Sequence, residues 1–97
     1  MELTKKERHK IYKQVLNNLN IGIYPLYVCG HLKKSTPELY NLYYNTSISS
    51  SKICEKYFPE FWSFRPDRYI ANNWWEYDNV GNNSRKAALE FCILMTK

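Results

Sequence analysis

The apolar positions near the start of the chain recur at the spacing of a helix. From Ile11 to Leu19 they return mostly every three to four residues, so they share one side of a helix with 3.6 residues per turn. Thr4 and Glu7 precede them in the arrangement of a capping box, in which each side chain bonds the other residue's backbone N–H. This pattern predicts a helix over residues 5–19.

Residues 21–34 allow two interpretations. One is an extended lead-in followed by a short helix from Pro25, because proline suits the first position of a helix. The other is a strand over Ile21–Cys29, where apolar residues are frequent. A short apolar run does not distinguish a strand from a helix, so the sequence leaves both interpretations open.

Two short helices are predicted in the middle of the chain from their start signals. A Ser-Thr pair precedes Pro37, which combines a capping side chain with a proline in the first turn. This helix is expected to end near Asn45. After a polar connection, Ser50 or Ser51 can cap a further helix through residues 52–57.

The last segment of the chain predicts another helix, from Ser84 to about Met95, with Asn82 or Asn83 as its cap. Its apolar residues cover a wide arc, so we expect the helix to lie in the core or under a partner. One face is formed by Ala88, Phe91, Cys92 and Met95.

Between these helices, the segment Tyr57–Tyr77 holds nine aromatic residues and includes Pro59 and Pro66. We expect it to be irregular, with short turns of helix. A chain of 97 residues suits one domain with one modest core. The prediction is a mainly α fold: a single-domain bundle over residues 1–97, with four to five helices and an irregular aromatic-rich segment.

The charge and the cysteines narrow the range of partners and cofactors. A formal net charge of +5 favours anionic partners such as nucleotides, nucleic acids or acidic proteins. The three cysteines are widely spaced and form no C-x-x-C pattern, so neither structural zinc nor another cofactor is expected. Such thiols fit a reducing compartment, and neither a signal peptide nor a membrane span is recognisable. We expect a cytoplasmic protein.

Catalysis has little support in the sequence. His9 lies among the charged residues of the first predicted helix and is expected to be exposed. Cys29 and His31 are near neighbours, but a nucleophile and its base normally meet across the fold, with a third group that orients them. No pair of carboxylates stands out either. We therefore expect no enzyme activity.

The aromatic segment and the start of the last helix form the candidate ligand site. Arginine pairs with phosphate in a forked geometry, aromatic faces stack on bases, and a helix start offers free N–H groups to an anion. The alternative is that the rings fill the core and the arginines pair with Asp67, Glu76 or Asp78. Of the adjacent Trp74 and Trp75, one is expected to be exposed. The candidate residues are Trp62, Arg65, Arg68, Tyr69, Trp74, Trp75, Tyr77, Asn83, Ser84 and Arg85.

Several short motifs, spread over most of the chain, resemble those of a known group of proteins. They are Leu3–Arg8 with Ile11-Tyr12, Pro37–Tyr40, the pairs Phe61-Trp62 and Trp74-Trp75, and Arg85-x-Ala87-x-Leu89-Glu90. Together they resemble small accessory proteins of phages that infect Bacteroidota. The resemblance implies a single-domain, mostly helical protein made early in infection, in the host cytoplasm.

For such a protein we expect a non-catalytic role in counter-defence. The first hypothesis is that it sequesters a nucleotide-type, phosphate-bearing immune signal with its rings and arginines. The alternatives are an inhibitor that binds a host defence protein through an aromatic-rich surface, and a weak RNA or single-stranded DNA binder with a steep dependence on salt. The apolar last helix is also compatible with a homo-oligomer.

Overall fold

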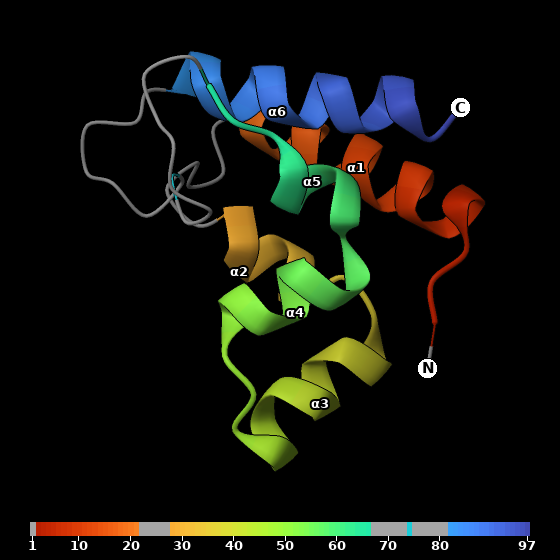
Figure 1. The fold of residues 1–97 in the computed structure, drawn as a ribbon, viewed down its shortest axis with the longest axis vertical. Helices are drawn as coiled ribbons and strands as arrows, with labels where there is room; N and C mark the ends of the chain where they lie inside the picture. Colours follow the sequence, from red (N-terminus) through yellow and green to blue (C-terminus); the bar gives the residue numbers. More distant parts are fainter. Residues whose placement is uncertain (1, 22–27, 67–73, 75–81) are drawn as a thin grey trace.

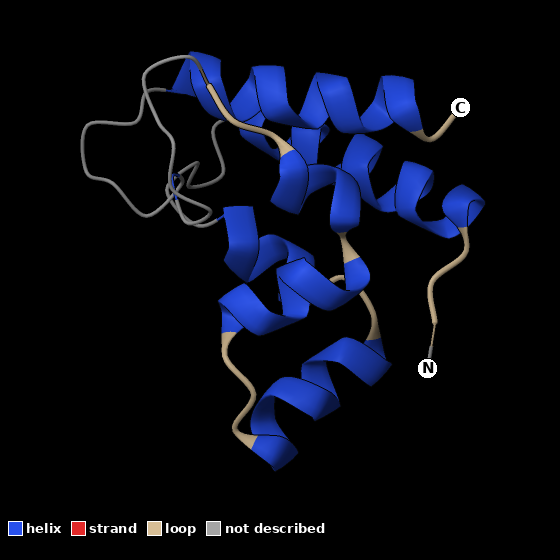
Figure 2. Ribbon diagram, in the orientation of Figure 1, coloured by secondary structure: helices blue, strands red, loops and turns tan. Residues whose placement is uncertain are grey.

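The part of the chain that the structure describes folds into helices (Figures 1 and 2). The structure, a computed structural model, describes residues 2–21, 28–66, 74 and 82–97. These ranges contain no strand, which confirms the predicted mainly α fold. The helices are α1 (Lys5–Asn20), α2 (Val28–Lys33), α3 (Pro37–Thr46), α4 (Ser50–Tyr57), α5 (Pro59–Ser63) and α6 (Asn82–Met95).

The capping box at the start of α1 is present as predicted. The Thr4 hydroxyl accepts the backbone N–H of Glu7 at 3.1 Å, and the Glu7 carboxylate accepts the backbone N–H of Thr4 at 3.0 Å. These bonds hold the pKa of Glu7 below its ordinary value. The helix extends one residue beyond the prediction and buries Ile11, Tyr12, Val15 and Leu19.

Helix α6 lies along α1 (Figure 1), but its buried face differs from the predicted one. Met95 is 51% exposed and Leu94 is 63% exposed, whereas Phe91 is half-buried. The helix also begins at Asn82, so Asn82 and Asn83 form its first turn and the prediction that one of them caps it was wrong. The buried face is formed by Arg85, Ala88, Leu89, Cys92 and Thr96.

Helix α2 settles part of the ambiguity in residues 21–34. Val28 and Cys29 are helical, so a strand that reaches Cys29 is excluded because its last residues belong to a helical turn. Residues 22–27, including Pro25, lie outside the described ranges. The predicted short helix is therefore confirmed for residues 28–33.

Helices α3 and α4 begin with the predicted type of cap. Thr36 accepts the backbone N–H of Leu39 at 3.1 Å, with Pro37 in the first turn. The cap of α4 is Ser49, which accepts the backbone N–H of Lys52 at 3.2 Å. The sequence predicted Ser50 or Ser51 as the cap, but both lie inside the helix. The prediction missed Ser49 because any serine in a run of three can act as an N-cap.

Glu60 on α5 connects this short helix to α1. Its carboxylate accepts two hydrogen bonds from Arg8, both at 3.0 Å, and one from the Tyr12 hydroxyl at 2.9 Å. Arg8 also donates to the backbone carbonyl of Leu3 at 2.7 Å. A forked arginine–carboxylate pair fixes orientation as well as distance, so it sets how α5 lies against α1.

The core occupies the space between α1, α6 and α5 and continues between α2 and α4 (Figure 1). Helix α3 contributes only Leu39 to the fully buried set, and it lies at the opposite end of the molecule from α6 (Figure 1). Cys54 and Cys92 are buried, and burial raises the pKa of the Cys92 thiol. In the described part of the chain, no helix is long and apolar enough to cross a bilayer.

Candidate functional site

Trp74, a member of the predicted ligand site, is a core residue. Its side chain is 0% exposed. Its ring centroid lies 5.9 Å from that of Phe61 and 5.8 Å from that of Phe64. A ring enclosed in this way offers no face on which a base could stack. For Trp74, the alternative that the rings fill the core is the one that the structure supports.

The predicted residues at the start of α6 are separated by burial. Arg85 is only 2% exposed, so its guanidinium is inside the protein. Asn83 is exposed and Ser84 is half-buried. The Arg85 side chain therefore lies in the protein interior, whereas Asn83 and Ser84 lie nearer the surface.

Trp62 lies within α5, and Arg65 follows the end of that helix. The Arg65 guanidinium donates to the backbone carbonyls of Trp62 and, at 2.7 Å, of Phe64. Both Trp62 and Arg65 are half-buried. The arginine thus caps the carboxyl end of the short helix α5 by donating to these carbonyls. The remaining predicted residues lie outside the described ranges, and these are Arg68, Tyr69, Trp75 and Tyr77.

A different group of aromatic side chains is accessible, on α3. Tyr40 is 42% exposed and Tyr44 is 59% exposed. Because they are four residues apart, they lie on the same side of the helix, and their ring centroids are 4.7 Å apart. Tyr43 meets Tyr44 edge to face, with centroids 5.2 Å apart. We call these three rings, together with the loop Ser47–Ser50, the tyrosine corner.

Two further interactions hold the rings in place. The ammonium group of Lys33, at the end of α2, lies 3.7 Å from the centre of the Tyr43 ring, a cation–π contact that ties α3 to α2. Interaction with the neighbouring Tyr44 hydroxyl raises the pKa of Tyr40.

A hollow adjoins the rings where the chain turns from α3 into α4. It has a volume of about 500 Å³. The turn passes through Ser47, whose φ of 56° is in the left-handed region. Two of the three tyrosines and the loop that follows them line the hollow: Tyr43, Tyr44, Ser47, Ile48, Ser49 and Ser50.

The tyrosine corner carries no charge of its own. The thirteen residues from Leu39 to Ser51 include no Asp, Glu, Lys, Arg or His, although 24% of the chain is charged. Tyrosine, serine and asparagine predominate, a composition typical of surfaces that bind proteins, whose centres are depleted of charge. The sequence does contain a signal for this surface, namely an uncharged run with tyrosines at positions i and i+4. The sequence favours the segment Tyr57–Tyr77 instead, because aromatic residues are more frequent there.

Metal binding or catalysis would use histidine, cysteine and acidic side chains, several of which lie in the described part of the chain. No three or more His, Cys, Asp or Glu side chains gather as metal ligands among the residues that the structure describes. His9, expected to be exposed, is half-buried, and its Nδ1 lies 3.0 Å from the Thr96 hydroxyl. Since that hydroxyl donates to the Cys92 carbonyl at 2.6 Å, it accepts a hydrogen bond from His9 when the imidazole carries its proton on Nδ1, which gives His9 a structural role.

Comparison with known proteins adds no family to this description. No model of a protein family, no curated protein and no solved structure matches the chain. The function therefore has to be inferred from the tyrosine corner and its surroundings.

Proposed function

We propose that this protein is a non-catalytic binding protein that holds a partner protein through the tyrosine corner. The observation that carries the proposal is the exposed pair Tyr40 and Tyr44, whose tilted rings are in contact, within an uncharged stretch of thirteen residues. A large ring buried at an interface contributes more free energy than most other side chains. Two such rings, side by side, can form the energetic centre of an interface.

The rings are already arranged for binding. The tilted ring contact between Tyr40 and Tyr44, and the edge contact with Tyr43, restrict the side-chain rotamers before a partner arrives. Less conformational entropy is then lost when the complex forms. The phenol hydroxyls and the serines of the loop can donate and accept hydrogen bonds around the rings.

The resemblance to phage accessory proteins suggests the class of partner. A small protein made early in infection would use such a surface to occupy a host defence protein and block it. An inhibitor of a host defence protein is one of the alternatives given in the sequence analysis. The aromatic surface proposed here lies on α3 and not in the segment Tyr57–Tyr77.

Sequestration of a phosphate-bearing nucleotide has less support among the described residues. Its main basis is the net charge of +5. Two of the residues expected to hold the ligand, Trp74 and Arg85, are buried, and Arg65 bonds backbone carbonyls. The same reasons weaken the hypothesis of RNA or single-stranded DNA binding, which needs exposed rings beside exposed cations.

The proposal is tested by capture and titration. The immobilised protein is incubated with host lysate, bound proteins are identified by mass spectrometry, and the affinity of the purified partner is measured. We expect the double variant Y40S/Y44S to bind about a hundredfold more weakly, since each ring is expected to act as a hot spot. Its melting temperature should fall only slightly, because neither ring belongs to the buried core.

The matched control is Leu94→Ser, which removes an exposed apolar side chain from α6. It should leave the affinity unchanged. Equal binding by Y40S/Y44S and the unchanged protein would overturn the proposal. So would a failure to capture any partner combined with stabilisation by a cyclic di- or trinucleotide, which reaches about 2.7 kcal/mol at a hundredfold excess over Kd.

A further inference from the structure

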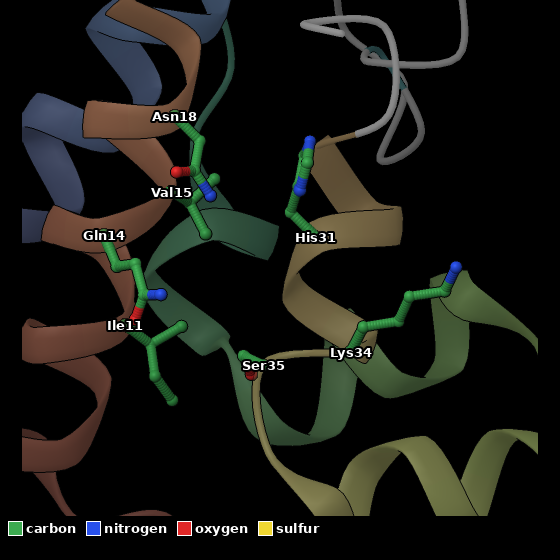
Figure 3. Close-up of a pocket in the computed structure, with 7 residues that line it drawn as sticks. All are labelled: Ile11, Gln14, Val15, Asn18, His31, Lys34 and Ser35. Carbon is green, nitrogen blue, oxygen red and sulfur yellow. The ribbon is translucent and has the colours of Figure 1, made fainter. Parts of the chain in front are cut away.

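A second hollow lies between α1 and α2, on different residues from the tyrosine corner (Figure 3). Its volume is about 160 Å³. Pockets for whole drug-sized ligands begin at about 300 Å³, so this one is large enough for a single flat group rather than a complete nucleotide. We call it the α1–α2 cleft.

The α1 side of the cleft combines an apolar floor with two amides. Ile11 and Val15 supply the apolar surface. Gln14 and Asn18, one helical turn apart, extend from α1 toward the gap (Figure 3). No hydrogen bond within the described ranges occupies either side-chain amide. Each therefore has N–H donors and a carbonyl acceptor available for a bound group.

His31 faces these amides from α2 (Figure 3). Its Nε2 atom is buried and has no hydrogen-bond partner in the part of the chain that the structure describes. Leaving a buried polar nitrogen unsatisfied is costly. A group that enters the cleft and displaces the atoms that cover Nε2 would recover that cost, so the unsatisfied nitrogen points to an occupant.

The remaining side chains limit the charge of that occupant. The Ser35 hydroxyl donates to the Leu32 carbonyl at 2.7 Å, so toward the cleft its oxygen can only accept. The Lys34 side chain extends away from the gap (Figure 3). With no cation directed into it, the cleft offers donors and acceptors side by side but no counter-charge for an anionic group.

From this juxtaposition we propose that the α1–α2 cleft binds a flat, uncharged nitrogen heterocycle of the nucleobase type. Such a ring carries alternating donors and acceptors on its edge, which the amides of Gln14 and Asn18 and Nε2 of His31 can match. Its faces are apolar enough to lie against Ile11 and Val15. The volume admits the base without its sugar and phosphates, which would extend into solvent.

The test is a titration with adenine, cytosine and uracil, followed by NMR of the side-chain amides and of the His31 ring. We expect saturable shifts of these signals with at least one base. Ribose 5-phosphate, which has no base, should cause none. Asn18→Leu should weaken the binding at least tenfold, because it removes one amide and leaves the apolar floor intact.

Asn17→Leu is the matched control: Asn17 is exposed on α1 and does not line the cleft, so its replacement should leave the affinity unchanged. A second variant, His31→Phe, should also weaken binding at least tenfold. The proposal is overturned if no base gives saturable shifts, if ribose 5-phosphate gives the same shifts, or if Asn18→Leu binds as the unchanged protein does. The variant Y40S/Y44S should bind the base normally, so this proposal and the proposed function can fail separately.

Discussion

Glu60 shows how one side chain determines the arrangement of two helices. Its carboxylate is the common acceptor for Arg8 and Tyr12, and both salt-bridge partners are mostly buried, with side-chain exposures of 17% and 16%. Burial alone raises the pKa of Glu60, but the hydrogen bonds from Arg8 and Tyr12 outweigh it, and the pKa falls below its ordinary value. The charged form is therefore the one that stabilises the fold.

Replacing Glu60 with Gln should lower the free energy of unfolding by about 1.5–3 kcal/mol at pH 7, the usual contribution of a hydrogen bond to a charged group. The sign of the pH dependence follows from the lowered pKa. Above the unfolded value of about 4.3, the stabilisation by Glu60 is fully present, and it is lost as the pH falls through the folded pKa. Urea unfolding between about pH 7 and 3 should thus show a shallower acid loss in Glu60→Gln than in the unchanged protein.

Glu55→Gln is the control for this prediction. Glu55 forms an exposed pair with Lys52 at 3.5 Å, and exposed pairs of this kind contribute roughly 0.5 kcal/mol or less. An equal loss of stability in both variants, or an unchanged acid slope in Glu60→Gln, would contradict the role assigned to Glu60.

At the scale of the elements, the starts of α1 and α3 were predictable, those of α4 and α6 were predicted two residues too late, and the buried face of α6 differed from the predicted one. A cap is read from three or four neighbouring residues, which is why Thr4 and Thr36 were identified as starts. The burial of Arg85 and the exposure of Met95 depend on which side of α6 meets α1, and a nearly all-apolar arc does not specify that. Tyr12 was likewise missed as a core residue, because its acceptor is 48 positions away.

The turn between α3 and α4 gives a prediction of its own. Ser47 is in the left-handed region, with φ 56° and ψ 21°, which costs a residue with a Cβ about 1–2 kcal/mol relative to glycine. Ser47→Gly should therefore raise the free energy of unfolding by about 0.5–1 kcal/mol, after the greater entropy of glycine in the unfolded chain is subtracted. Thermal unfolding followed by circular dichroism measures the change.

Ser47→Val provides the opposite test, because a β-branched residue tolerates positive φ poorly. It should lower the melting temperature. If glycine destabilised the protein as much as valine does, the left-handed conformation of Ser47 would not be the native one.

At the scale of the whole molecule, Trp74 links segments that are far apart in the sequence. Its ring contacts Phe61 and Phe64, and Phe64 in turn lies 5.4 Å from Phe91 of α6, measured between ring centroids. The high aromatic content of the sequence is thus explained in part by a small core that is filled with large rings. The sequence alone did not show that Trp74 would be one of these rings.

Trp74→Ala should remove about 3–5 kcal/mol of stability, the usual cost of deleting a buried aromatic side chain. That is a large share of the roughly 5–15 kcal/mol available to a small domain, so guanidinium unfolding should begin at much lower denaturant concentration. Trp62→Ala, at a half-buried position, should cost less. A Trp74→Ala protein as stable as the unchanged one would mean that Trp74 is not a core residue.

The location of the tyrosine corner has a consequence for how quickly a partner could be found. Association is accelerated when opposite charges steer two molecules together, and surfaces without such steering associate at about 10⁵–10⁶ M⁻¹s⁻¹. Residues 39–51 carry no charge, and they lie at the end of the molecule opposite α6 (Figure 1). A complex formed there would owe its lifetime to slow dissociation of the packed rings, and variants of Tyr40 or Tyr44 would shorten that lifetime while leaving the rate of encounter nearly constant.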